Sequence, residues 1–129
     1  MATALDTNGN VLVAGYFAGS VTFGNTTLTS AGSNDLFVAK WVPGAGTGTG
    51  SWAWAQRGGG TSDDQGLGIA VSGTSVYVTG YITNTTANDA GVVFGSTAVA
   101  GATSTSSADL VLACYTDNTT GATLSWTQV

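Results

Sequence analysis

The sequence Val11-Leu-Val-Ala-Gly-Tyr-Phe17 returns later in the chain as Val76-Tyr-Val-Thr-Gly-Tyr-Ile82. Three further segments recur in the same order: Val21–Gly24 as Val92–Gly95, Asp35–Trp41 as Asp109–Tyr115, and Trp52–Gln56 as Leu124–Gln128. The residue number rises by 65 from Val11 to Val76, by 71 from Phe23 to Phe94, by 74 from Asp35 to Asp109 and by 72 from Trp54 to Trp126. Each change of offset falls in a stretch rich in Gly, Thr, Asn and Ser, where insertions are tolerated. The sequence therefore predicts two copies of one structural unit, residues 1–58 and 59–129, with the longest insertion of the second copy at 83–91.

The recurring segments are typical of β-strands covered on both sides. In residues 11–17, successive side chains point to opposite faces of a strand, and both faces carry apolar or aromatic residues. A strand that exposes one face to water alternates apolar with polar residues, so these strands are expected to be buried on both faces. Gly15 and Gly80 occupy the same place in the two copies, which indicates a bulge or the close approach of a neighbouring backbone.

Each copy contains about four such strands and no helical pattern. We therefore predict an all-β fold of two four-stranded antiparallel sheets, of the type found in the blades of β-propellers. A two-sheet sandwich is the alternative fold. The aromatic residues recur at matching strand positions, which favours packing between sheets. The predicted packing and assembly residues are Trp52, Trp54, Trp126, Tyr16, Tyr81, Gly15 and Gly80.

The order of motifs resembles a known repeat family. It consists of Val-Leu-Val-Ala-Gly-Tyr-Phe at 11–17, Phe-Gly at 23–24, Asp-Leu-Phe-Val-Ala-Lys-Trp at 35–41 and Gly-Gly-Gly-Thr-Ser-Asp-Asp-Gln-Gly at 58–66. This pattern is similar to the bacterial seven-bladed β-propeller repeat, the SBBP repeat, in two copies that cover nearly the whole chain. The resemblance implies a bacterial cell-surface or secreted propeller protein and names no substrate or catalytic residue. The second copy departs from the pattern in its first turn, Ser72-Gly-Thr-Ser75, and in its longer loops.

Two blades cannot close a propeller, which needs about four to eight. The outer faces of the pair must therefore be covered by other copies of the chain or by further repeats of a longer polypeptide. Residues 50–68 form the hinge between the two copies. The chain starts with the equivalent of the strand that follows this hinge and ends with the equivalent of the strand that precedes it, an order that suits head-to-tail association. Such contacts produce a ring if they close and a filament if they do not. The first residues do not read as a signal peptide, so export would require a leader removed from a longer precursor.

Composition excludes several functional classes. The 129 residues include no Glu and no His, only two basic residues and seven Asp, for a net charge of −5. Nucleic-acid binding requires clustered Lys and Arg, and an anionic membrane surface attracts the same residues, so neither is an expected partner. No apolar run is long enough to span a bilayer. A surface of Thr, Ser, Asn and Gly with 7% charged residues suits a secreted or cell-surface protein.

Few residues offer catalytic or metal-binding chemistry. Without His or Glu, neither a Ser–His nor a Cys–His pair can form, and we predict no enzymatic activity. Asp63 and Asp64 are weak candidates for calcium, because two adjacent carboxylates lack the spaced third ligand of known loops and Asp is common in turns. No other cofactor is predicted. Asp35 and Asp109 are expected to cap strand entries, and Cys114 to fill space in a strand.

The sequence thus predicts a non-enzymatic extracellular structural protein that self-associates head-to-tail. The alternative is a cell-surface module that binds carbohydrate or another protein, in which outward-facing tryptophans stack against sugars. The predicted partner in the first case is a second copy of the chain, and in the second a glycan or a surface protein.

Overall fold

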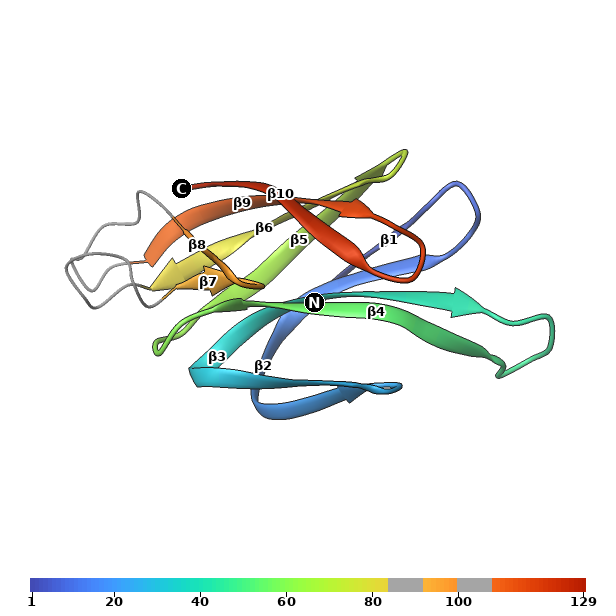
Figure 1. The fold of residues 1–129 in the computed structure, drawn as a ribbon, viewed down its shortest axis with the longest axis horizontal. Coiled ribbons are helices and arrows are strands. Elements are labelled where there is room, and N and C mark those ends of the chain that lie inside the picture. Colours follow the sequence, from blue (N-terminus) through green and yellow to red (C-terminus); the bar gives the residue numbers. More distant parts are fainter. Residues whose placement is uncertain (84–91, 100–107) are drawn as a thin grey trace.

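The computed structural model describes residues 1–83, 92–99 and 108–129, which form two antiparallel β-sheets. Figure 1 shows the second sheet lying over the first. The predicted insertion at 83–91 lies almost wholly outside the described residues. In the described part of the chain, no helix is long and apolar enough to cross a membrane. The strands are β1 (Ala2–Leu5), β2 (Val11–Phe23), β3 (Thr26–Pro43), β4 (Gly50–Gly59), β5 (Gln65–Ser72), β6 (Ser75–Thr83), β7 (Val93–Phe94), β8 (Thr97–Ala98), β9 (Ala108–Asp117) and β10 (Ala122–Gln128).

The all-β expectation agrees with the structure, but the division of strands differs from two sheets of four. The first sheet has the order β1-β2-β3-β4-β7-β8, and the second has the order β10-β9-β6-β5. The short hairpin β7–β8 comes from the second half of the sequence, yet it pairs with Gly58 and Gly59 at the edge of β4. The missing side chain of Gly58 makes this possible, because a Cβ there would lie 2.7 Å from the ring of Phe94. A hairpin of the second copy thus completes the sheet of the first.

Strand pairing in the second sheet repeats that of the first at the residues aligned by sequence. Val11 lies opposite Trp41 and Gly15 opposite Phe37 in the first sheet; Val76 lies opposite Tyr115 and Gly80 opposite Val111 in the second. Two further equivalent pairs are Lys40 with Trp54 and Cys114 with Trp126. Each sheet also has an irregularity directly beside its own pair, where the strand that carries the tryptophan has an extra residue. The internal repeat of the sequence is therefore also a repeat of register.

Strands β2 and β3 are longer than the sequence indicated. The stretch 25–34 reads as a loop because it is rich in Thr, Ser, Asn and Gly, yet β3 already begins at Thr26. Across this extension the hydroxyls of Ser20 and Thr29 pair at 3.1 Å, and those of Thr22 and Thr27 at 3.0 Å. Threonine is favoured in strands, and cross-strand hydroxyl pairs stabilise a sheet on its water-facing side. Polar composition was therefore a poor guide to loop structure here.

The apolar side chains form two cores, one on each side of the first sheet. The larger core lies between the sheets and contains Leu12, Ala14, Leu36, Val38 and Trp54 from the first and Val76, Val78, Ile82, Val111, Ala113 and Tyr115 from the second. The smaller core contains Phe17, Phe23, Phe37, Ala39 and Ala55. Figure 1 shows β2 and β3 bending sharply at one end. This bend curls the first sheet around the smaller core.

Replacing Tyr115 by phenylalanine is expected to stabilise the protein by about 1 kcal/mol. Its hydroxyl is buried and has no hydrogen-bond partner among the described residues, and this burial raises the pKa of Tyr115 above its ordinary value. Removing an unsatisfied buried hydroxyl while keeping the ring relieves a desolvation cost. Chemical denaturation of both proteins measures the difference. Tyr16→Phe is the control, because that side chain is 45% exposed and its hydroxyl can be hydrated, so stability should hardly change.

Candidate functional site

The two sheets pack against each other through opposite faces. Because the repeat aligns their strands, the same face can be identified in each sheet. Face A is the side of the central strands that carries Leu12, Val38 and Trp54 in the first sheet and Tyr77, Leu112 and Trp126 in the second. Face B is the opposite side, which carries Val13, Ala39 and Ala55 in the first sheet and Val78, Ala113 and Thr127 in the second. Face A of the first sheet and face B of the second sheet meet in the larger core. One face of each sheet is therefore left at the outside of the pair.

Face A of the second sheet is exposed where the same face of the first sheet is buried. Leu110 is 76% exposed, whereas its counterpart Leu36 is completely buried. Trp126 is 43% exposed, whereas its counterpart Trp54 is 4% exposed. The difference arises because the second sheet covers Leu36 and Trp54, while nothing in the described part of the chain covers Leu110 and Trp126 to the same extent. Exposed apolar side chains on one face of a sheet offer a surface on which another molecule can pack.

Face B of the first sheet holds an apolar groove of about 400 Å³. Its lining residues come from the N-terminus, from β2, and from β3 and β4: Met1, Val13, Tyr16, Phe17, Val21, Phe23, Phe37 and Trp52. The aromatic rings are packed edge to face, with the centroids of Phe23 and Trp52 4.9 Å apart and those of Trp41 and Trp52 5.3 Å apart. Rings held in this way form a fixed apolar surface. This groove and face A of the second sheet are the two candidate binding surfaces.

The three predicted tryptophans occupy three different environments. Trp54 lies between the sheets, and its indole nitrogen donates a hydrogen bond of 3.0 Å to Asp117. Trp126 has the same register but is exposed, with its ring centroid 6.3 Å from that of Tyr77. Trp52 lies on the other side of the first sheet, beside the apolar groove. The sequence pattern that aligned Trp54 with Trp126 gave their register, and the neighbouring sheet decides their exposure.

The two predicted glycines lie where backbones approach closely. A Cβ on Gly80 would lie 2.0 Å from the carbonyl oxygen of Gln65 in β5. A Cβ on Gly15 would lie 2.7 Å from the side chain of Met1, and the carbonyl oxygen of Gly15 is itself 2.9 Å from the position of a Cβ on Gly66. Both positions therefore exclude a side chain. Gly15 also lies where β2 of the first sheet meets β5 of the second.

Cys114 and Tyr81 lie on face A of the second sheet, whereas Tyr16 borders the groove on face B of the first. Cys114 is 4% exposed and stands between Tyr77 and Trp126 on the adjacent strands. Tyr16 is 45% exposed at the rim of the apolar groove. Tyr81 is partly buried, and its hydroxyl donates to Asp63 at 2.6 Å. This hydrogen bond raises the pKa of Tyr81 to about 12.

Asp63 and Asp64 are engaged by protein donors. Asp63 accepts hydrogen bonds from Tyr81, Asn34 and Gln65, and these donors lower its pKa. Asp64 accepts from the backbone N–H of Gly60 at 2.7 Å and that of Thr83 at 2.8 Å. In the residues that the structure describes, no group of three or more His, Cys, Asp or Glu is arranged to hold a metal ion. The observed contacts are those of residues that fix the connection between β4 and β5.

Asp64 is expected to make the protein less stable as the pH rises toward neutrality. Burial raises the pKa of Asp64 to about 6, against an ordinary value of 3.8. Between these values the folded chain binds a proton that the unfolded chain has lost, so the free energy of unfolding decreases with rising pH. Denaturation of the wild type between about pH 4.5 and 7 measures this dependence.

Asp64→Asn should flatten the dependence over the same interval. Asp63→Asn is the control, because it removes only the smallest of the causes that raise the pKa of Asp64, so Asp64 should still titrate in this interval. The lowered pKa of Asp63 itself affects stability only at more acidic pH, where that contribution is lost as the pH falls. An unchanged slope in Asp64→Asn would show that Asp64 does not titrate in this range.

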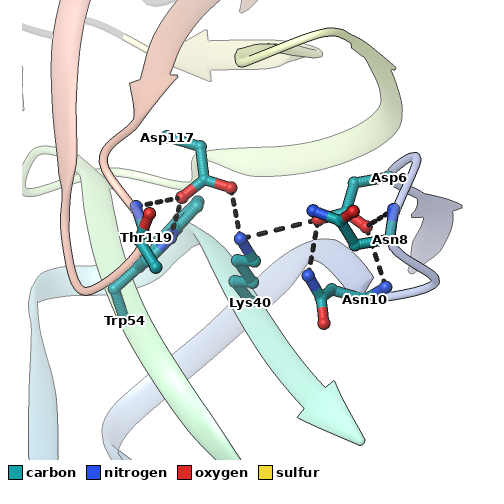
Figure 2. Close-up of polar contacts among 7 residues, drawn as sticks. All are labelled: Asp6, Asn8, Asn10, Lys40, Trp54, Asp117 and Thr119. Atoms are coloured by element: carbon teal, nitrogen blue, oxygen red, sulfur yellow. Dashed lines mark hydrogen bonds and ion pairs between the residues drawn. The ribbon is translucent and has the colours of Figure 1, made fainter.

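A buried polar cluster joins the two sheets and was not found from the sequence. Lys40 in β3 is 5% exposed, and its Nζ lies 2.5 Å from Oδ2 of Asp117 and 3.5 Å from Oδ2 of Asp6 (Figure 2). Asp117 also accepts hydrogen bonds from Trp54 and from the backbone of Thr119. The only signal in the sequence is that Lys40, one of two basic residues, interrupts an apolar strand. Its counterpart in the second copy is Cys114, so the second copy has no lysine at the equivalent position.

The chain was compared with models of known protein families, with curated proteins and with solved structures, and none of the comparisons found a significant match. The resemblance to the SBBP repeat stays a prediction. No function is carried over from another protein, and the two uncovered faces and the buried cluster are the features of this chain that bear on its function.

Proposed function

We propose that the chain is a non-enzymatic structural protein whose copies associate head-to-tail through the two uncovered faces. The observation that carries this proposal is the packing inside the chain itself, where face A of one sheet meets face B of the next. What the pair leaves at its outside is one face B, on the first sheet, where the curl of the sheet leaves the apolar groove open, and one face A, on the second. A second copy of the chain offers the complementary face to each of them, in the same relative order as the internal contact.

The chemistry of the two faces supports this association. Face A of the second sheet presents Leu110 and Trp126, and face B of the first sheet presents the apolar groove, where the partly buried Trp52 lies beside the largely buried rings of Phe17 and Phe37. No charged side chain lies among the residues that line that groove, so no side-chain charge needs to be desolvated there. Aromatic and aliphatic side chains of this kind carry most of the binding energy in protein interfaces.

The proposed association is between unlike faces and therefore need not stop at a dimer. Contacts of this type give a ring if the rotation between copies closes and a filament if it does not. Sheets repeated face to face in this way are the arrangement of propeller blades, so the resemblance to the SBBP repeat and an extracellular location are part of the same proposal. A chain poor in charge and rich in Thr, Ser, Asn and Gly suits that location.

Light scattering over a range of concentrations, with electron microscopy of the same samples, tests the proposal. We expect particles of more than one chain, seen as rings or filaments of regular repeat. A folded monomer of 12.7 kDa at all concentrations would refute self-association of this chain.

A second candidate function, the binding of a neutral sugar, is supported by one pocket. A pocket of about 460 Å³ lies beside Trp41 and Trp52 and is otherwise lined by Gly, Ala, Asn, Thr and Ser residues without charge. Aromatic rings beside amide and hydroxyl groups suit a neutral saccharide. The pocket lies on face B, so a bound sugar would compete with the proposed association. Binding to a glycan array that Trp41→Ala removes would favour this function.

A further inference from the structure

The buried cluster around Lys40 brings three reactive side chains together from distant parts of the chain. Lys40 belongs to β3, Asp6 follows β1, and Asp117 ends β9 in the other sheet. The side chains of Lys40, Asp6 and Asp117 are only 6%, 8% and 11% exposed. Lys40 also lies between Leu12 and Trp54 on the neighbouring strands, both of them buried. The amine and the two carboxylates therefore meet in a part-buried site in which each side chain has little contact with water.

The carboxylate of Asp117 is held with one oxygen toward Lys40 and the other toward two N–H donors (Figure 2). Oδ2 lies 2.5 Å from the Lys40 nitrogen, and Oδ1 accepts hydrogen bonds of 3.0 Å from the indole of Trp54 and 3.0 Å from the backbone of Thr119. Thr119 has a φ of 74°, which is rare for a β-branched residue, and in this conformation its N–H points at Oδ1. Two fixed donors on one oxygen are what stabilises a tetrahedral oxyanion in acyl transfer.

Asp6 supplies a proton acceptor beside the amine. Its carboxylate is fixed by the backbone N–H groups of Asn8 and Asn10, both at 2.9 Å, and by the Asn10 side chain at 2.7 Å. Burial raises the pKa of Asp6, but the hydrogen bonds from Asn10 and Asn8 and the charge of Lys40 outweigh it, so this pKa lies below its ordinary value. Asp6 is therefore ionised at neutral pH. A carboxylate in contact with an ammonium group can take its proton and pass it on.

We propose that Lys40 and Asp117 react with each other to form an amide, an isopeptide bond that joins the two sheets covalently. The Nζ–Cγ bond forms and the Cγ–Oδ2 bond breaks. The ammonium group gives up two protons, one of them by way of Asp6, and both leave with Oδ2 as one water molecule. An ammonium and a carboxylate thus become a neutral amide and water, so atoms and charge balance without an oxidant, a reductant or any further reactant.

Each neighbour has a defined part in this reaction. Lys40 is the nucleophile, Asp117 the electrophile, and Asp6 the general base and acid. Trp54 and Thr119 stabilise the negative charge that develops on Oδ1. The amine is already held against the carboxyl group, so the reaction has the advantage of an intramolecular step. The reaction occurs once in each chain and needs no second copy, so it is independent of the proposed assembly.

Intact-mass measurement of the purified protein tests the bond directly. We expect the wild type to be lighter than its sequence by the mass of one water, at once or after prolonged warming. Trypsin can cleave only after Lys40 and Arg57, and an amide at Lys40 removes the first of these sites. A tryptic digest under denaturing conditions should therefore leave residues 1–57 and 58–129 joined, as a single species on a denaturing gel.

Two variants separate the reaction from mere proximity. Lys40→Arg keeps a positive charge between the two carboxylates but cannot form the amide, so it should show the full sequence mass and separate fragments. Asp6→Asn keeps the size of the side chain and should slow bond formation by about 100-fold or more. Asp63→Asn, outside the cluster, should form the bond at the wild-type rate. A folded wild type that keeps its full sequence mass after prolonged warming would overturn the proposal and leave only an ion pair.

Discussion

Replacing Leu110 by aspartate is expected to abolish the self-association of the chain while leaving its fold intact. Leu110 is 76% exposed on face A of the second sheet, so the isolated chain loses almost no packing. In the proposed assembly the same position corresponds to Leu36, which is completely buried between the sheets. A carboxylate there would be buried without a partner. The dissociation constant should increase by about 30-fold or more, which corresponds to about 2 kcal/mol.

Size-exclusion chromatography with light scattering measures the loss of assembly, and circular dichroism tests whether the variant is folded. Leu67→Asp is the matched control, because Leu67 is also exposed, at 53%. The equivalent pairs of Ala2 with Ala14 and of Gly68 with Thr79 make Met1 its counterpart in the first copy. Met1 stays 85% exposed although the second sheet packs on the first. We therefore expect Leu67, at the equivalent position, to stay outside the proposed contact between copies. Equal effects of the two substitutions would show that face A is not the interface.

The repeat and its register could be predicted because they depend on short segments of the sequence that resemble each other. The alignment of Val11 with Val76 and of Trp54 with Trp126 rests on short strands of similar composition, and the observed strand pairs follow it. Alternation along a strand then determines which side chains share a face. It does not determine what covers that face. Trp54 and Trp126 therefore have the same register and opposite exposure, which only the position of the neighbouring sheet explains.

The features that could not be predicted are contacts between distant segments. The hairpin β7–β8 joins the first sheet because Gly58 leaves room for Phe94, and no local pattern links these two residues. In the same way, Lys40 and Asp117 are 77 residues apart, and their pairing depends on how the sheets are stacked. A lone lysine in an apolar strand indicates that a buried charge needs a partner, but it does not name that partner.

Replacing Lys40 by methionine is expected to give a folded chain that is less stable than the Lys40→Arg variant by about 3 to 5 kcal/mol. Methionine fills similar space but removes the positive charge between Asp6 and Asp117, whose carboxylates are 8% and 11% exposed. Two like charges would then lie close together in a poorly hydrated site without the cation that neutralises them. Urea denaturation at neutral pH, monitored by tryptophan fluorescence, measures the change in the free energy of unfolding.

Lys40→Arg is the reference for this comparison because neither variant can form an amide with Asp117. Any covalent contribution is therefore absent from both, and the difference between them reports the charge alone. Arginine keeps the cation between the two carboxylates and should retain most of the stability that methionine loses. The double variant Lys40→Met with Asp117→Leu should recover part of the lost stability. It removes the Asp117 carboxylate, which would otherwise be left without a cation between the sheets. If Lys40→Met is as stable as Lys40→Arg, the cluster does not hold the sheets together by charge.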